Sequence, residues 1–172
     1  ENGKPVRLDS VVVSCQHTED KNLKKLEAEI RKKVLLPALR LLPPDEDTKI
    51  FINPLGRFVC GGMDADTGLT GRKLMVDSYG SMVPHGGGAF SGKDCSKVDR
   101  SAAYMARYIA KNIVAAGLAS KCQVSLAYAI GVAQPVMVQV DTFGTGNVCA
   151  DDCLELAIPL VFGLTPKQIV DT

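Results

Sequence analysis

Stretches of β-branched residues and one amphipathic stretch alternate along the first sixty residues. Arg7–Gln16 carries a run of three valines, which is typical of a largely buried strand. From Lys21 to Leu36, apolar side chains recur every three or four residues between charged ones, so the pattern predicts a helix with one buried face. Lys49–Asn53 and Arg57–Cys60 are predicted to be short strands, joined by a turn with the sequence NPLG.

The middle of the chain has one weak strand pattern, a glycine-rich loop and one strong helix pattern. Leu74–Val76 is predicted to be a brief strand, and Tyr79–Ser91 a loop. The pattern then predicts a long helix over residues 96–116, with six alanines that allow close packing against a sheet. Ser96 and Asp99 have the spacing of a capping box, and Gly117 stands where a helix C-terminal glycine is expected.

Period-two alternation returns in the last fifty residues. Cys122–Gly131 and Val136–Phe143 alternate apolar and polar positions, which predicts an antiparallel strand pair. A helix over Cys149–Phe162, interrupted by Pro159, and a last helix from Lys167, capped by Thr165-Pro166, complete the order. Strand pairs with intervening helices predict an α+β fold, with antiparallel or mixed sheets and helices on one face.

Composition narrows the function classes. Of 172 residues, 46% are hydrophobic and 23% charged, as in globular domains, and the net charge of +1 excludes a general nucleic-acid or membrane-surface role. No apolar run is long enough to cross a bilayer. Six scattered cysteines indicate reduced thiols, as in a cytoplasmic protein. The chain begins at Glu1 without an initiator Met, so we expect an internal segment of a longer protein.

The candidate chemistry is concentrated in residues 66–100. This stretch contains an Arg-Lys pair, a triple glycine, a Gly-Lys-Asp turn and further charges at the start of the predicted helix. Glycine backbone, lysines and a helix N-terminus together suit a polyphosphate, and the carboxylates of Asp66, Asp94 and Asp99 suit Mg²⁺ or a ligand ammonium. The spacing Gly87-x₄-Gly92-Lys93 is that of a P-loop, but Asp94 replaces the required Ser or Thr, which argues against that motif.

The motifs of this stretch resemble those of the S-adenosylmethionine synthetases, also called methionine adenosyltransferases. The resemblance rests first on GGGAFSGKD (86–94) and KVDRSAAY (97–104). It extends over nearly the whole chain through five further motifs: VVVSCQH (11–17), FINPLGRFV (51–59), GLTGRK (68–73), ARYIAKNIVAAGLA (106–119) and YAIGVAQP (128–135).

The resemblance implies a reaction of ATP with L-methionine. In this family the methionine sulfur attacks the ribose C5′, displacing triphosphate that is then hydrolysed, with Mg²⁺ and K⁺ as cofactors. It implies catalytic roles for Arg72, Lys73 and Lys93 on the leaving triphosphate. The ATP and phosphate contacts it implies are Arg57, Phe58, Asp66, Arg72, Lys73, Ala89, Lys93 and Lys97. Asp66 and Lys97 would also bind methionine, and Asp99 would lie at the metal.

Without the resemblance, several of these residues have simpler interpretations. Arg57 and Lys73 could be ordinary surface residues, Asp99 a helix cap, and Phe58 a core residue. His17 and His85 receive no role.

The chains of this family are longer, with an N-terminal part that carries a catalytic His, metal-binding acids and the K⁺-site Glu. The alternative function for this chain is therefore a catalytically incomplete module that binds phosphate or mediates oligomerisation.

The resemblance implies that the chain is part of an interleaved three-unit fold. We expect residues 1–62 to belong to one α+β unit, residues 63–100 to bind substrate and phosphate, and residues 101–172 to belong to a second unit. The resemblance also implies a homodimer or homotetramer whose active sites are shared between subunits.

Overall fold

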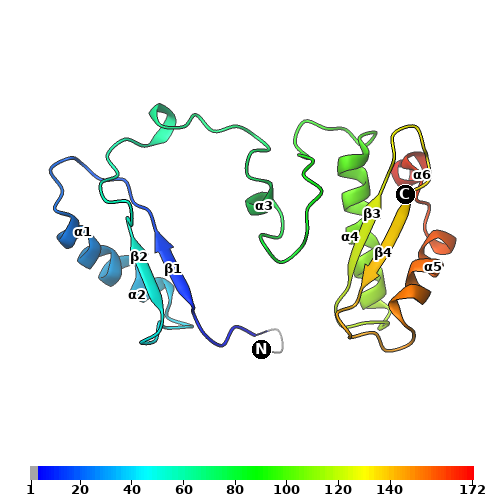
Figure 1. Ribbon diagram of the computed structural model, residues 1–172, viewed down its shortest axis with the longest axis horizontal. Coiled ribbons are helices and arrows are strands. Elements are labelled where there is room, and N and C mark those ends of the chain that lie inside the picture. The colour runs from blue at the N-terminus through cyan, green and yellow to red at the C-terminus, as the bar shows by residue number, and fades with distance from the viewer. Residues whose placement is uncertain (1–3) are drawn as a thin grey trace. The chain divides into compact units, whose positions relative to one another are not determined.

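A computed structural model of the chain describes residues 4–172 (Figure 1). The chain divides into two units, Glu1–Gly68 (unit 1) and Leu69–Thr172 (unit 2). Each has its own small hydrophobic core.

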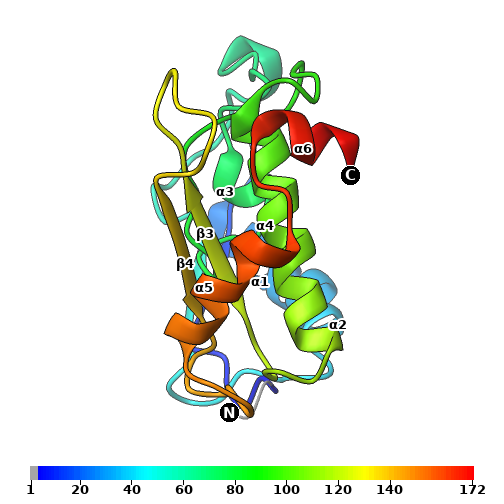
Figure 2. The ribbon, with the colours of Figure 1, turned by 90° about the vertical axis from the view of Figure 1, so that its right-hand side faces the viewer.

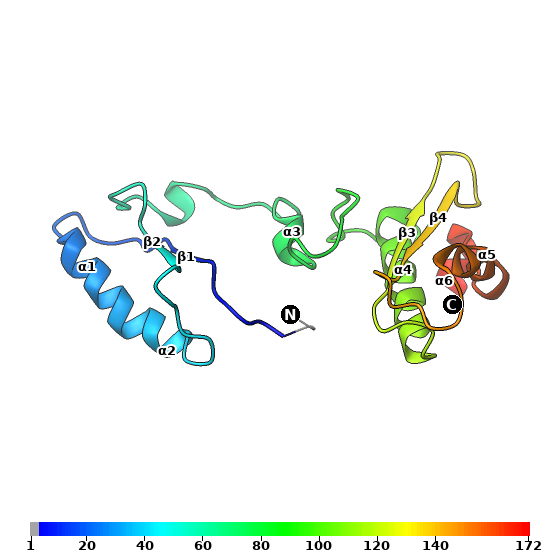
Figure 3. The ribbon, with the colours of Figure 1, turned by 60° about the horizontal axis from the view of Figure 1, so that its bottom comes forward.

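Unit 1 is a helix packed on a pair of parallel strands. Its elements are β1 (Ser10–Val13), α1 (Leu23–Ile30), the π-helical turn η1 (Arg31–Leu35), α2 (Leu36–Ala38), β2 (Lys49–Ile52) and the 3₁₀ turn η2 (Gly62–Asp64). Figure 3 shows α1, η1 and α2 running on as one rod. Ser10 pairs with Lys49 and Val13 with Ile52, so the rod is the crossover that parallel strands require.

The core of unit 1 follows the predicted helix face. Leu26, Ile30 and Leu35 are buried against alternate residues of the two strands (Val11, Val13, Ile50 and Ile52). The side chain of Asn22 accepts a hydrogen bond from the Lys25 N–H and caps the helix. The wide π-helical turn ends two residues before Pro37, which has no N–H to donate to the preceding turn.

Unit 2 packs α4 and α5 on one face of an antiparallel strand pair (Figures 2 and 3). Its elements are α3 (Leu74–Asp77), α4 (Val98–Ala115), β3 (Gln123–Ala127), β4 (Met137–Asp141), α5 (Asp151–Val161) and α6 (Pro166–Asp171). Val140 is buried and pairs with Val124, on the strand face that meets α4 and α5. Gln139 and Asp141 are exposed on the opposite face.

The helix α4 is the centre of the unit 2 core. Ile109 is fully buried, with Met105 and Ile113 one turn away on the same face, and they pack with Leu154 and Ile158 of α5. Gly117 follows the C-terminal cap of α4, and its φ of +73° allows the Gly117 and Leu118 N–H groups to bond the carbonyls of Val114 and Ile113. The predicted C-terminal glycine is therefore confirmed.

Several sequence predictions about elements are confirmed. Strand cores occur within Arg7–Gln16, Lys49–Asn53, Cys122–Gly131 and Val136–Phe143, and the second pair is antiparallel as expected. Residues 79–91 contain no helix or strand. Thr165 caps the last helix through a reciprocal bond pair with Gln168.

Two predicted strands are wrong. Arg57–Cys60 forms no strand, because its polar backbone groups bond mainly to side chains of residues 16 and 17. Leu74–Val76 lies in the helical turn α3, where the Asp77 N–H bonds the Lys73 carbonyl. A run of three apolar residues such as Leu74–Val76 fits a strand and a helical turn equally well, so periodicity could not distinguish these two conformations.

Two smaller expectations also fail. Ser96 does not cap α4, because both its N–H and its hydroxyl are directed to Asp94, and the helix begins only after Lys97. The helix α5 continues through Pro159 instead of breaking there, held by the buried side chains of Leu154 and Ile158. The predicted fold class itself is confirmed, since the parallel β1–β2 pair and the antiparallel β3–β4 pair give an α+β chain with mixed sheets.

Within residues 4–172, none of the helices has the length and apolar character needed to cross a membrane.

Candidate active site

Two lysine–carboxylate pairs stand where the glycine-rich loop enters α4. The Lys93 ammonium lies 2.6 Å from an Asp99 oxygen, and the Lys97 ammonium 2.9 Å from an Asp94 oxygen. Lys93 is the more enclosed of the two cations, since only 26% of its side chain is exposed against 52% for Lys97. Three predicted site residues (Lys93, Lys97 and Asp99) thus take part in two ion pairs within residues 93–99.

Asp94 organises the turn between the two lysines. One carboxylate oxygen accepts from both the hydroxyl and the N–H of Ser96, and the other accepts from Lys97. The hydrogen bond from the Ser96 hydroxyl has the largest effect on the pKa of Asp94, and the bond from Lys97 the next largest. Together they hold this pKa far below its usual range. Asp94 is therefore an anion at neutral pH and fixes the Lys97 ammonium beside the helix start.

The N-terminus of α4 has no side-chain cap. Lys97 occupies the N-cap position without a capping hydrogen bond, and Asp99 in the first turn bonds Lys93. The partial positive charge of an 18-residue helix thus lies at the same end as two lysines, each of which is paired with a carboxylate. This arrangement suits a ligand with several negative oxygens.

Close backbone approach accounts for two of the glycines. A Cβ at Gly88 would lie 2.8 Å from both Cβ and Cγ of Asp99, so only glycine lets the loop pass the carboxylate. A Cβ at Gly71 would lie 2.6 Å from Cβ of Ala89. Through this second contact the loop that carries Arg72 and Lys73 packs against Ala89 of the glycine-rich loop.

A chain of rings anchors the glycine-rich loop to α4. The Phe90 ring lies 5.5 Å from His85 and 5.8 Å from Tyr104 between centroids, and the Arg100 guanidinium stacks 5.8 Å from the Tyr104 ring. Arg100 also donates to the Lys93 carbonyl, and His85 accepts from the Gly87 N–H through Nδ1. These contacts fix both ends of the loop.

Arg72 and Lys73 lie exposed at the start of α3. The Lys73 ammonium donates to the Arg72 carbonyl at 3.4 Å. Among the residues that the structure describes, the Arg72 guanidinium has no hydrogen-bond or ion-pair partner, so it is available to an external anion.

The remaining predicted contacts lie in unit 1. Phe58 is half-buried, and the Arg57 guanidinium donates to the Glu19 carbonyl. Asp66 accepts from the Gly68 N–H at 2.9 Å in a tight turn. Arg57 and Phe58 belong to one segment that is hydrogen-bonded to residues 16–19. Asp66 lies further along the chain, in a separate turn.

Sequence reasoning missed three residues that organise these segments. Asp94 was noted only as a departure from a P-loop and as a possible carboxylate ligand, although it pairs with Lys97. Gln16 and His17 received no role, yet both bond the backbone of the Arg57–Val59 segment. Their place in the motif VVVSCQH was the only signal in the sequence.

The chemistry of the carboxylates fits one type of metal site. No group of three or more His, Cys, Asp or Glu side chains that could enclose a metal occurs within residues 4–172. Mg²⁺, however, is commonly held by one or two carboxylates together with substrate phosphates and water. Asp99, exposed and adjacent to Lys93, fits the role of such a single protein ligand.

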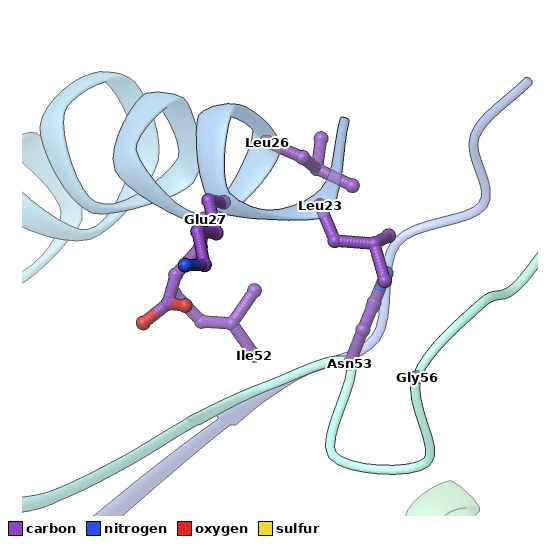
Figure 4. A pocket seen from close by; sticks show the side chains of 7 residues that line it. Leu23, Leu26, Glu27, Ile52, Asn53 and Gly56 are labelled. Atoms are coloured by element: carbon purple, nitrogen blue, oxygen red, sulfur yellow. The ribbon is translucent and has the colours of Figure 1, made fainter. Parts of the chain in front are cut away.

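Two hollows of the structure lie away from the predicted site. One of about 200 Å³ lies between α1 and the end of β2 (Figure 4), and it is lined by Leu23, Leu26 and Ile52 together with Lys24, Glu27, Asn53 and Gly56. Another, of about 330 Å³, lies between α4 and α6 in unit 2. Neither is lined by a residue predicted to bind substrate.

Comparison with known proteins gives the same family for both parts of the chain. The central domain of S-adenosylmethionine synthetase matches residues 1–58, and the C-terminal domain matches residues 60–172. An S-adenosylmethionine synthase of Myxococcus xanthus (strain DK1622) is 56% identical over 170 residues, covering 99% of this chain and 43% of that protein.

A solved structure supports the relationship. The structure of an unusual S-adenosylmethionine synthetase from Campylobacter jejuni is similar with a TM-score of 0.75 and 47% identity, covering 96% of this chain. The chain spans 43% of the length of each of these two relatives. At this level of identity over nearly all of its length, the chain belongs to the S-adenosylmethionine synthetase family.

Proposed function

We propose that the protein to which this chain belongs makes S-adenosylmethionine from ATP and L-methionine. The methionine sulfur would attack the ribose C5′ and displace triphosphate, which is then hydrolysed to pyrophosphate and phosphate. The observation that carries the proposal is the pair of lysines, Lys93 and Lys97, at an uncapped helix start beside the glycine-rich loop.

This chemistry needs charge and orientation more than proton transfer. A thioether sulfur has no proton to lose, so no general base is required for the attack. The leaving triphosphate gains negative charge in the transition state, and fixed cations lower that barrier. We assign this catalytic role to Arg72, Lys73 and Lys93.

The other residues would position the two substrates. Arg57 and Phe58 would bind the nucleoside, with the half-buried Phe58 ring available to the adenine, and Ala89 would offer backbone beside it. Asp66 and Lys97 would contact methionine, and Lys97 the phosphates as well.

Asp99 would hold Mg²⁺, which when bound offsets the charge of the phosphate oxygens. We propose K⁺ as a second cofactor on the family resemblance, with its ligands outside this chain. The resemblance also supports a homodimer or homotetramer with shared active sites. The six cysteines, all free in the structure, support a cytoplasmic location.

A second candidate rests on the length of the chain. Because the chain covers 43% of its relatives, it could by itself be a catalytically incomplete module that binds phosphate or mediates oligomerisation. A phosphate-binding surface without the rest of the active site cannot exclude water or order both substrates, so we expect the 172 residues alone to lack turnover.

The test combines intact mass with activity. The purified natural protein should have a mass about twice that of this chain and release triphosphate products from ATP only when methionine, Mg²⁺ and K⁺ are present. Methionine-independent release, or none, would refute the synthetase assignment. A natural protein of this chain's mass that is inactive would favour the second candidate.

A further inference from the structure

Residues 16–19 run beside the segment that carries Arg57 and Phe58, and hydrogen bonds tie the two segments together. The His17 N–H donates to the Phe58 carbonyl at 3.0 Å. In return, the Phe58 N–H donates to Nε2 of the His17 ring at 3.0 Å. The Phe58 backbone is therefore held from both its polar groups by one residue.

The imidazole takes the place of a backbone carbonyl in this pairing. In a strand ladder the Phe58 N–H would bond a carbonyl of the neighbouring strand. Here a side chain accepts it, and the segment leaves regular strand geometry while keeping its donor satisfied. This substitution explains why residues 57–60 are not a strand although their pattern predicts one.

The second ring nitrogen defines the form of the ring. Nδ1 of His17 lies 2.8 Å from the Thr18 carbonyl, which can only accept, so Nδ1 carries the hydrogen. Nε2 is then left with a lone pair for the Phe58 N–H. The two bonds together fix the orientation of the ring and select one neutral tautomer.

Neighbouring contacts hold the residues on either side of Phe58. The Gln16 side chain donates to the Val59 carbonyl at 2.9 Å, and the Arg57 guanidinium donates to the Glu19 carbonyl. Gly61 passes so close to Gln16 that an added Cβ would lie 2.5 Å from its Oε1. Three consecutive residues (57–59) are thus each bonded to the 16–19 segment.

We propose that His17 is a positioning residue for the nucleoside end of ATP, and that it acts through the Phe58 backbone. The inference rests on the proposed function, in which Arg57 and Phe58 contact the nucleoside. Because the bond to Nε2 sets the backbone of Phe58, its loss changes where the ring presents its face. The methionine contacts lie on other segments and do not depend on it.

Two variants separate the roles of the two ring nitrogens. In His17→Asn the shorter amide can still bond the Thr18 carbonyl in place of Nδ1, but nothing reaches the Phe58 N–H. In His17→Gln the longer amide places its oxygen near the position of Nε2 and keeps that acceptor. His17→Ala removes both.

The measurement is steady-state kinetics of the complete protein, with KM determined separately for ATP and for methionine. Loss of one hydrogen bond predicts that His17→Asn and His17→Ala raise the KM for ATP about three- to tenfold. His17→Gln should remain within about twofold of the natural protein. The KM for methionine should stay within about twofold in all three variants.

Thermal unfolding of each variant distinguishes positioning from general stability. A lower melting temperature with an unchanged KM for ATP would overturn the proposal, as would equal effects of His17→Asn and His17→Gln. If His17→Ala fails to fold, the Asn and Gln pair still decides the outcome.

Phe58→Ala separates this inference from the function on which it rests. If Phe58→Ala leaves the KM for ATP unchanged, the nucleoside role of the segment is wrong. If Phe58→Ala raises that KM and His17→Asn does not, the nucleoside role stands and the positioning role of His17 is wrong.

Discussion

Gly88→Ala should displace a proposed metal ligand without straining the backbone. Gly88 does not have a positive φ, so alanine is compatible with its conformation. The new Cβ would nevertheless lie 2.8 Å from Cβ and Cγ of Asp99 and 3.1 Å from its Oδ2. Because Cβ of Asp99 is fixed by the first turn of α4, rotating the side chain cannot relieve the contact.

The size of the effect follows from these distances. Carbon atoms pack best at about 3.5 to 4.0 Å, so loop and helix start must separate by about 1 Å. Such overpacking costs about 1 to 3 kcal/mol of stability. Misplacement by about 1 Å costs up to about 100-fold in rate, so we expect the turnover number of the complete protein to fall about 10- to 100-fold.

Gly86→Ala is the matched control in the same loop. A Cβ at Gly86 meets no atom within 4 Å, and its φ is not positive either. Both variants are assayed for initial rates at saturating ATP and methionine over a range of Mg²⁺ concentrations, alongside thermal unfolding. Gly86→Ala should keep its turnover within about twofold.

Two results would refute the reasoning. Natural turnover and Mg²⁺ dependence in Gly88→Ala would show that the position of Asp99 does not matter for the reaction. Equal losses in the two variants would show that the loop is sensitive for a reason other than the contact with Asp99.

Three further outcomes are expected. Lys93→Ala should lower turnover of the complete protein more than it weakens methionine binding, and equal losses would contradict a transition-state role for that cation. Ile109→Ala should lower the free energy of unfolding by about 2 to 5 kcal/mol and Ile109→Val by about 0.5 to 1.5 kcal/mol in urea titrations, because Ile109 is fully buried; similar losses would contradict its place in the core. Hydrogen bonds from the Thr142 hydroxyl and N–H lower the pKa of Asp151 in the folded state. Because of this lower pKa, the ionised Asp151 stabilises the fold above the unfolded pKa of about 3.9, and the stabilisation is lost as the pH falls through the folded pKa. Thr142→Val should therefore be less stable than the natural protein at pH 7, with a difference that shrinks below about pH 4; a difference that does not change with pH would refute this coupling.

The sequence was informative wherever the relevant physics is local. The three- and four-residue spacing of apolar side chains predicted the helices of both cores, and Gly117 marked the end of α4 because few other residues accept its φ of +73°. The motif GGGAFSGKD indicated the family, which the comparisons confirm. Period-two alternation correctly predicted the β3–β4 pair, whose strands are close in sequence.

Contacts between distant segments required the tertiary structure. That β1 pairs with β2 in parallel depends on the crossover through α1, and 38 residues separate pairs such as Ser10 and Lys49. Residues 57–60 were predicted to be a strand, but the His17 imidazole, 41 residues away, accepts from the Phe58 N–H in place of a strand carbonyl.

The same distinction applies to the candidate site. The residue types and spacing from Arg72 to Asp99 indicated a phosphate-binding surface before any geometry was known, because charge and backbone freedom are properties of the residues themselves. The folding of the loop onto α4 determines which carboxylate pairs with which lysine. In the structure Asp99 pairs with Lys93, and Asp94 pairs with Lys97. Residue types determine what a segment can bind, whereas the packing of the loop determines where each charge is held.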